Sequence, residues 1–206
     1  MGWIKNGGWG KKRQLLREIP PSRGNGMQDP AQERNEVTGR LARAVTLLEN
    51  SMGAGLIPHG GASIAYAIRG ARDAHGVAAV PGGIVCREGK VSAGGPCAFG
   101  ADERSALLVL TVMKFDPHMR SAATIRFSEK VLAVFEAVLL ECASIDRRRE
   151  PPGTGTMDWS VAACCKDGVP DVMYDRGGDN QPALLHLFGE DPVGVANNII
   201  ICSNRI

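Results

Sequence analysis

The sequence has no apolar stretch approaching the roughly 18 to 20 consecutive residues that a bilayer-spanning helix needs. Its N-terminal residues also lack the apolar run of a secretory signal peptide. These absences argue against a membrane protein and predict a cytoplasmic one.

Paired cysteines are missing as well, because no two cysteines have the CxxC spacing of a zinc or redox motif. Most of the six cysteines stand inside apolar segments, so we expect small buried hydrophobic residues rather than metal ligands or disulfides. They are Cys86, Cys97, Cys142, Cys164, Cys165 and Cys202.

A strong charge imbalance is also absent, because the formal net charge of the chain is only +2. Positive charge is concentrated in residues 1–26, which hold six basic residues against one acidic residue. Nucleic acid is therefore not expected as a partner for the whole molecule, although a basic segment of this kind can contact an acidic partner.

The remaining composition is that of a folded domain, with 44% hydrophobic and 22% charged residues in a chain of 206. Residues 1–35 are rich in glycine, proline and charge, and Pro20 and Pro21 stop their one helix-like stretch. We predict a flexible basic arm over residues 1–35 and a single domain over residues 36–206.

Within that domain, apolar residues at helical spacing begin after residue 36 and predict an amphipathic helix. They are Val37, Leu41, Ala44, Val45 and Leu48. Further helices are expected over residues 102–115, 128–143, 157–166 and 192–201, the first of them capped by Asp102. Strands are expected at residues 64–68, 84–86, 123–127, 144–146, 171–174 and 184–188, with a hairpin turn at residues 88–89. This alternation predicts an α/β sheet covered on both faces, with a ligand at the strand ends.

Two arginines in or beside the strand at residues 123–127 are the sharpest chemical signal. The side chain of Arg126 must extend away from the strand, and its charge needs an anion or a carboxylate as a partner. For Arg120 and Arg126, the residues leave two alternatives open: contact with a ligand, or a salt bridge to Asp116 or Asp146.

Residues 113–128, MKFDPHMRSAATIRFS, resemble the signature of ThiN-type thiamine-phosphate synthase domains, which reads KFDP and then RSAxNIRY. Matching segments occur in the family's order, so the resemblance extends from Glu36 to the C-terminus. They are residues 56–58, 67–72, 77–82, 95–101, 146–151, 156–159 and 168–177.

The resemblance implies a three-layer α/β/α sandwich similar to class II aldolases. It also implies a reaction that joins an aminopyrimidine pyrophosphate to a thiazole phosphate, giving thiamine phosphate and pyrophosphate. Arginines and backbone amides would neutralise the leaving pyrophosphate. The one cofactor that could take part is an Mg²⁺ ion that accompanies the pyrophosphate. Its candidate neighbours are Asp116, Asp146, Asp171 and Asp175. A homodimer would be compatible with the family.

The sequence departs from the family's pattern at positions that the resemblance assigns to catalysis and ligand contact. Gly83 stands where the family has the arginine of PGRI, and Arg104 stands where it has the histidine of FGASxH. Thr124 and Ser63 each replace an asparagine, and residues 179–182 replace a segment that carries a lysine. We therefore expect catalysis to be weakened or lost.

The phosphate-binding positions that the resemblance implies are Ser63, Gly83, Gly100, Ala101, Arg120, Thr124, Arg126 and Asp175. Arg104 is the one residue that could still act in catalysis, and no protein metal site is expected. The four histidines do not occupy the lost histidine's position and are expected to be surface or packing residues; they are His59, His75, His118 and His186.

Three functions remain open from the sequence. The first is a domain that binds thiamine phosphate or its precursors without efficient catalysis. The second is a working synthase with altered residues, and the third is a partner or regulatory subunit that uses its basic arm.

Overall fold

The computed structural model describes residues 29–145, 158–178 and 181–206. The helices are α2 (Pro30–Ser51), α3 (Glu103–Met113), α4 (Glu129–Ala137), α5 (Trp159–Cys164) and α6 (Pro192–Ser203), with short 3-10 turns η1 (Ala54–Leu56) and η2 (Ala74–Gly76). The strands are β1 (Ser63–Ala67), β2 (Val77–Ala79), β3 (Ile84–Arg87), β4 (Lys90–Ala93), β5 (Ala98–Phe99), β6 (Ser121–Arg126), β7 (Cys142–Ser144), β8 (Val172–Asp175) and β9 (Leu184–Gly189).

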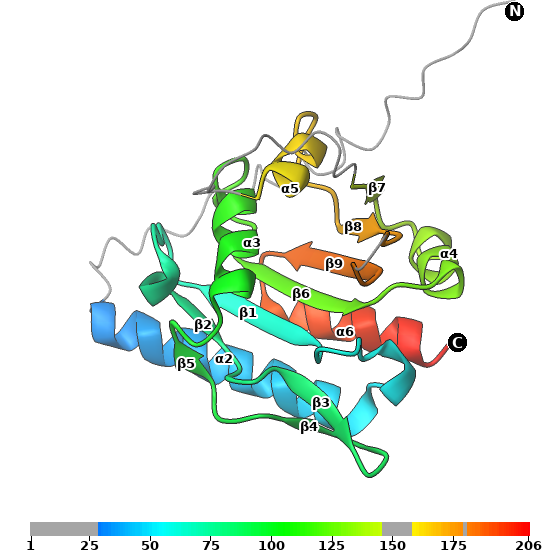
Figure 1. The fold of residues 1–206 in the computed structure, drawn as a ribbon. Helices are drawn as coiled ribbons and strands as arrows, with labels where there is room; N and C mark the ends of the chain where they lie inside the picture. Colours follow the sequence, from blue (N-terminus) through cyan, green and yellow to red (C-terminus); the bar gives the residue numbers. More distant parts are fainter. Residues whose placement is uncertain (1–28, 146–157, 179–180) are drawn as a thin grey trace, which may run out of the picture.

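Seven strands form one sheet in the order β5-β2-β1-β6-β9-β8-β7, and β3 and β4 form a separate hairpin (Figure 1). β7 and β8 pair in parallel, whereas the other neighbours in the large sheet run antiparallel. The alternation of strands and helices thus predicted the layers of the fold but not the direction of its strands.

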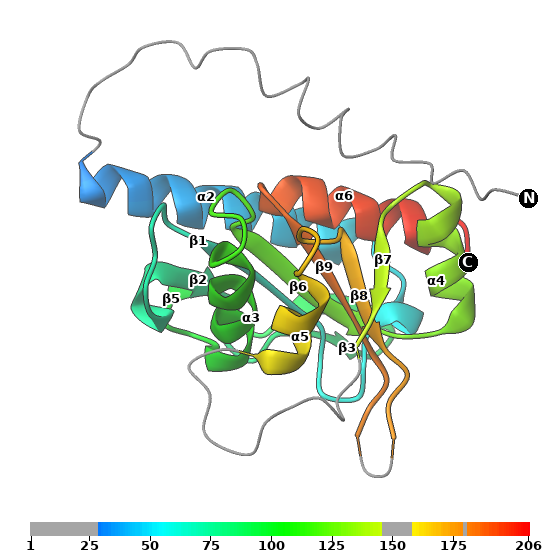
Figure 2. The same ribbon diagram turned by 90° about the horizontal axis from the view of Figure 1, so that it is seen from above.

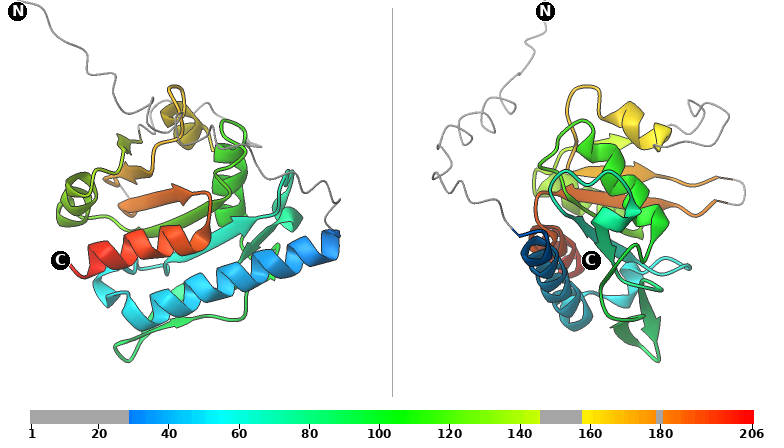
Figure 3. Two further views of the ribbon diagram at one scale, coloured as in Figure 1. Left: turned by 180° about the vertical axis from the view of Figure 1, so that it is seen from behind. Right: turned by 90° about the vertical axis from the view of Figure 1, so that its left-hand side faces the viewer.

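The sheet lies between two layers of helices, with α2 and α6 on one face and α3 and α5 on the other (Figure 2). Alternate residues of each strand serve the two layers. Ile64 and Ile125 pack with Leu41 of α2, whereas Ala65 and Ala122 pack with Val109 of α3. The predicted α/β fold with three layers is therefore confirmed, and Figure 3 shows α2 and α6 side by side on one face.

The first helix begins at Pro30, so residues 30–35 are helical and not part of an arm as the sequence suggested. The Asp29 side chain accepts a hydrogen bond from the Ala31 amide, and a proline at the first helical position lacks only an N–H that would have no helical partner. The buried positions expected in this helix are confirmed, from Val37 to Leu48. Residues 1–28, the rest of the expected arm, lie outside the described residues.

The fourth helix is shorter than expected, because α4 ends at Ala137 and not near residue 143. Leu139 adopts a positive φ of 64°, and the chain then turns into β7, where Cys142 pairs with Val172. The strand expected at residues 144–146 thus lies earlier, at Cys142–Ser144. Residues 142–144 thus pair with β8 as a strand, although the pattern of the sequence predicts that the helix continues through them.

The predicted hairpin turn is confirmed, because β3 and β4 are joined at Glu88 and Gly89, which both have positive φ. The expectation of buried cysteines holds only for Cys165 and Cys202. Cys97, Cys142 and Cys164 are partly buried, and Cys86 on β3 is exposed. None of the described helices combines the length and apolarity needed to cross a bilayer.

Candidate functional site

Hydroxyl, imidazole and carboxylate groups gather between the sheet and the N-terminus of α3; we call Ser63, Asp102, Ser105, Thr124 and His186 the α3-side cluster. Ser63 on β1 lies opposite Thr124 on β6, which lies opposite His186 on β9. Thr124 Oγ1 and His186 Nδ1 are 3.0 Å apart. Hydrogen bonds join Ser63 Oγ to Ser105 Oγ (2.9 Å) and Ser105 Oγ to Asp102 Oδ2 (2.6 Å). The antiparallel register thus brings three strands and one helix to a single polar centre.

Asp102 holds α3 against this centre because it is the N-cap of the helix, as the sequence predicted. Its Oδ1 accepts hydrogen bonds from the amides of Arg104 (3.0 Å) and Ser105 (3.4 Å). Arg104 is exposed in the first turn of α3, one residue before the buried Ser105. The position of the family's histidine is therefore beside the α3-side cluster.

Gly83 backs onto the start of β1, next to the cluster. It has a φ of +69°, and a Cβ atom built there would lie 2.6 Å from the carbonyl oxygen of Ala62, the residue before Ser63. The backbone at this position therefore requires glycine. Four of the positions at which the sequence departs from the family, residues 63, 83, 104 and 124, converge on this end of the sheet.

Arg126 and Asp175 extend the cluster along the same face, because each pairs with Leu184 from one side of β9. Asp175 is 5% exposed and accepts a hydrogen bond from the Gly177 amide at 2.8 Å. Arg126 is exposed, and among the described residues no ion pair involves it. The salt bridge to Asp116 that the sequence left open is thus not formed, and Asp146 lies outside the described residues.

Arg120 does not join Arg126. It precedes β6 whereas Arg126 ends that strand, so at about 3.3 Å per residue their backbones are roughly 20 Å apart. Arg120 donates a hydrogen bond to the Tyr66 hydroxyl, lies 4.7 Å from the centre of the Tyr66 ring and is 3.6 Å from Glu33 Oε1. The two arginines therefore do not share one phosphate site.

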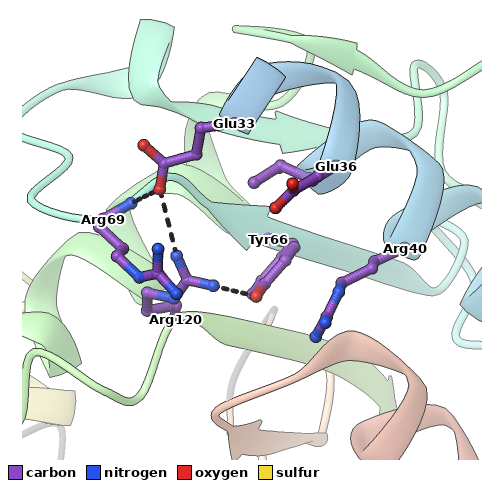
Figure 4. A pocket seen from close by; sticks show the side chains of 7 residues that line it. Glu33, Glu36, Arg40, Tyr66, Arg69 and Arg120 are labelled. Atoms are coloured by element: carbon purple, nitrogen blue, oxygen red, sulfur yellow. Dashed lines mark hydrogen bonds and ion pairs between the residues drawn. The ribbon is translucent and has the colours of Figure 1, made fainter. Parts of the chain in front are cut away.

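Arg120 instead lines a pocket beside α2, which we call the Arg120 pocket (Figure 4). Its polar lining consists of Glu33, Glu36, Arg40, Tyr66, Arg69 and Arg120. Glu33 Oε1 also accepts a hydrogen bond from the Arg69 amide at 2.8 Å.

Gly100 is at the Arg120 end of the sheet as well. Its amide donates to the carbonyl of Val77, which lies opposite Ala67, and the Ala67 amide donates to the carbonyl of Arg120. Ala101 packs with the core on the α3 side. Six of the predicted site residues thus lie in or beside the α3-side cluster, Gly100 and Ala101 lead into Asp102 of that cluster, and Arg120 lies at the opposite end of β6. The six are Ser63, Gly83, Arg104, Thr124, Arg126 and Asp175.

Sequence reasoning missed His186 as a site residue. It is 7% exposed and hydrogen-bonded to Thr124, whereas His59, His75 and His118 are exposed as expected. The strand pattern of residues 184–188 contained the signal, because alternate residues of a strand point to one face.

The candidate metal neighbours are dispersed over the fold. Asp116 accepts from the His118 amide, Asp171 from the Glu141 amide and Asp175 from the Gly177 amide. Over residues 29–145, 158–178 and 181–206, no group of three or more His, Cys, Asp and Glu side chains is placed to hold a metal ion.

Known proteins are similar to this chain in sequence and in fold. The family model for thiamine-phosphate synthase ThiN matches residues 40–201. The bifunctional thiamine biosynthesis protein ThiDN of Methanocaldococcus jannaschii is 31% identical over 81% of this chain, and the chain spans only 40% of that protein. Thiamine-phosphate synthase ThiN of Methanothermobacter thermautotrophicus is 30% identical over 76% of this chain and 86% of its own.

Solved structures agree with the family match. The C-terminal domain of a phosphomethylpyrimidine kinase is 30% identical, with a TM-score of 0.77 over 82% of this chain and 100% of that one. L-fuculose 1-phosphate aldolase from Glaciozyma antarctica is a more distant neighbour, 13% identical with a TM-score of 0.49 over 87% of this chain and 74% of its own. The family match over most of the chain shows that it belongs to the ThiN family of thiamine-phosphate synthase domains.

Proposed function

We propose that this chain binds thiamine phosphate, or its pyrimidine pyrophosphate and thiazole phosphate precursors, at the α3-side cluster, and that its synthase activity is weakened or lost. One observation carries the proposal. The positions that the family pattern marks, residues 63, 83, 104 and 124, are far apart in the sequence and lie at one end of the sheet.

Binding has suitable groups at this end. Ser63 and Thr124 offer hydroxyls, His186 offers an imidazole, and the exposed Arg126 has no ion-pair partner among the described residues. A guanidinium fork suits the oxygens of a phosphate group. Arg126 is therefore the residue that we assign to the phosphate.

Catalysis has lost two groups here. A departing pyrophosphate gains negative charge, and preorganised donors that meet this charge lower the barrier. Gly83 supplies no side chain, and the backbone around it leaves no room for one. Arg104 retains a positive charge but not the imidazole of the family, so binding can persist while the reaction slows.

His186 favours a second candidate, a working synthase. Its ring lies 3.0 Å from Thr124 within the cluster, so this end of the sheet retains one imidazole although position 104 has none. This imidazole could hold or move a proton at the leaving group. Turnover with both precursors separates this candidate from the first.

Calorimetric titration with thiamine phosphate and with unphosphorylated thiamine tests the binding site. Arg126→Met keeps the apolar stem and removes the fork, so affinity for the phosphate ester should fall about ten- to a hundred-fold, which corresponds to about 1.5 to 3 kcal/mol. Thiamine affinity should not change. Arg87→Met, an exposed arginine in the β3–β4 hairpin, is the matched control and should leave both affinities unchanged. Equal binding by Arg126→Met and the parent chain would contradict the site.

A further inference from the structure

The Arg120 pocket is separate from the α3-side cluster and plays no part in the proposed function. It lies between α2 and the Ala67 end of the sheet, where Glu33, Glu36 and Arg40 of α2 face Tyr66 of β1 (Figure 4). The α3-side cluster lies at the opposite end of β6 and on the face that packs with α3. A ligand in the Arg120 pocket would therefore bind independently of thiamine phosphate at the cluster.

The chemistry of the pocket favours an anion. Six of its seven lining residues are polar or charged, and they include three arginines, Arg40, Arg69 and Arg120, against two glutamates. Arginine suits oxyanions because its planar fork donates two parallel hydrogen bonds. The free space of about 60 Å³ has room for about four to six water-sized groups, close to the five heavy atoms of a phosphate ion.

Arg120 is incompletely satisfied by the partners it has. Its side chain is 14% exposed, and its guanidinium has five N–H donors to place. The Tyr66 hydroxyl accepts one hydrogen bond. The Glu33 carboxylate is 3.6 Å away, beyond the roughly 2.7 to 2.9 Å of a charge-assisted hydrogen bond. Arg120 thus donates one side-chain hydrogen bond to the described residues, and its other N–H groups can donate to a ligand in the pocket.

The Glu33 carboxylate occupies the position beside Arg120 that a bound oxyanion would take. Its side chain is 19% exposed, and the oxygen nearest Arg120 also accepts the Arg69 amide at 2.8 Å. Arg40, which also lines the pocket, forms an ion pair with Asp191 at 2.6 Å. A carboxylate held by a backbone amide against a buried arginine shows where a phosphate oxygen would be received.

We propose that the Arg120 pocket binds a small tetrahedral oxyanion, with Arg120 as the main contact and the Glu33 carboxylate competing for the same guanidinium. Inorganic phosphate is the probe that matches the volume and the charge of the pocket. The phosphate end of a small ester has the same chemistry and would enter with its organic part toward solvent.

Calorimetric titration of the full chain with inorganic phosphate tests this proposal through variants with opposite signs. Glu33→Gln keeps an oxygen for the Arg69 amide and removes the competing charge, so phosphate should bind about ten-fold more tightly. Arg120→Met should weaken binding at least ten-fold. Arg87→Met, an exposed arginine in the β3–β4 hairpin and outside both sites, is the matched control and should bind phosphate as the parent does.

Tyr66→Phe keeps the test decisive if Arg120→Met does not fold. It removes only the hydroxyl that holds Arg120, so phosphate affinity should change while the Glu33→Gln gain persists. Titration with glycerol phosphate identifies the source: Arg120-dependent binding of the ester extends the site to esters, and its absence restricts the site to the free ion. The proposal is overturned if neither the parent nor Glu33→Gln binds phosphate, or if Arg87→Met loses as much affinity as Arg120→Met.

Discussion

The two ends of β6 carry the same residue type in two different situations. Arg126 is exposed, has no ion-pair partner among the described residues, and lies beside positions that the family pattern marks. Arg120 is mostly buried, stacks on Tyr66 and faces Glu33. One short motif thus places two arginines in different surroundings, and the burial and partners of each arginine, rather than sequence distance, distinguish them.

The largest effect is expected at the family's arginine position. Gly83→Arg places a side chain at positive φ, where its Cβ meets the Ala62 carbonyl at 2.6 Å, so we expect a loss of about 2 to 4 kcal/mol in the free energy of unfolding. Synthase activity should not return. Gly89→Ala in the β3–β4 turn is the control, because it also has positive φ (+77°) but meets nothing within 4 Å, and should cost about 1 kcal/mol. Equal losses in urea unfolding would show that the backbone at Gly83 does accept a side chain.

A smaller effect is expected from removing the N-cap of α3, and comparison with another N-cap separates loss of binding from loss of helix stability. Asp102→Ala removes the N-cap of α3 and the partner of Ser105, so it should cost about 1 to 2 kcal/mol of stability and lower the affinity for thiamine phosphate. Asp191→Ala removes the N-cap of α6 and should lower stability similarly without affecting that affinity. The comparison fails if both variants bind thiamine phosphate equally well.

The core layers on the two sides of the sheet can be compared through their buried thiols. Burial raises the pKa of Cys165, on the α3 side, to about 12 and the pKa of Cys202, on the α2 side, to about 11, from an ordinary value near 9.0. The unfolded chain therefore releases these protons first, so the stabilisation is complete below pH 9 and is lost as pH rises from 9 toward 12. We expect a loss of about 1.3 kcal/mol per thiol between pH 8 and 10 in urea unfolding. Cys202→Ala should reduce this pH dependence, and an unchanged slope would contradict the assignment.

Truncation of the N-terminus should give the smallest effect. Removing residues 1–28 should leave the thermal midpoint nearly unchanged, because that segment has no periodic apolar face. Removing residues 1–35 also takes away the Asp29 cap and Glu33, so the midpoint should fall by several degrees. A drop of more than a few degrees with the shorter truncation would show that Trp3 or Trp9 docks on the core.

Local features of the fold were readable from the sequence because their causes are local. The caps at Asp102, Ser128 and Asp191 stand directly before apolar helices, and the turn at Glu88 and Gly89 separates two short strands. The start of α2 at Pro30 was also readable, from the Asp29 cap followed by proline, but the polar residues 32–35 have no apolar periodicity that predicts a helix.

Long-range features were not readable because they depend on strand pairing. The pairing of β6 with both β1 and β9 brings Ser63, Thr124 and His186 together, and no periodicity in the chain encodes that order. The separation of Arg120 from Arg126 has the same origin. Alternation along a strand predicts which face a residue lies on, but not which helix lies at each end of the strand.

Turnover tests the central claim most directly. Thiamine phosphate formation from the two precursors should be measured for this chain and for the synthase of Methanothermobacter thermautotrophicus under the same conditions. Loss of one preorganised donor costs about 10² to 10³ in rate, so this chain should be at least about a hundred-fold slower while still binding thiamine phosphate. Turnover equal to that of the relative would contradict the account, and would place catalysis on Arg104, Arg126 or His186.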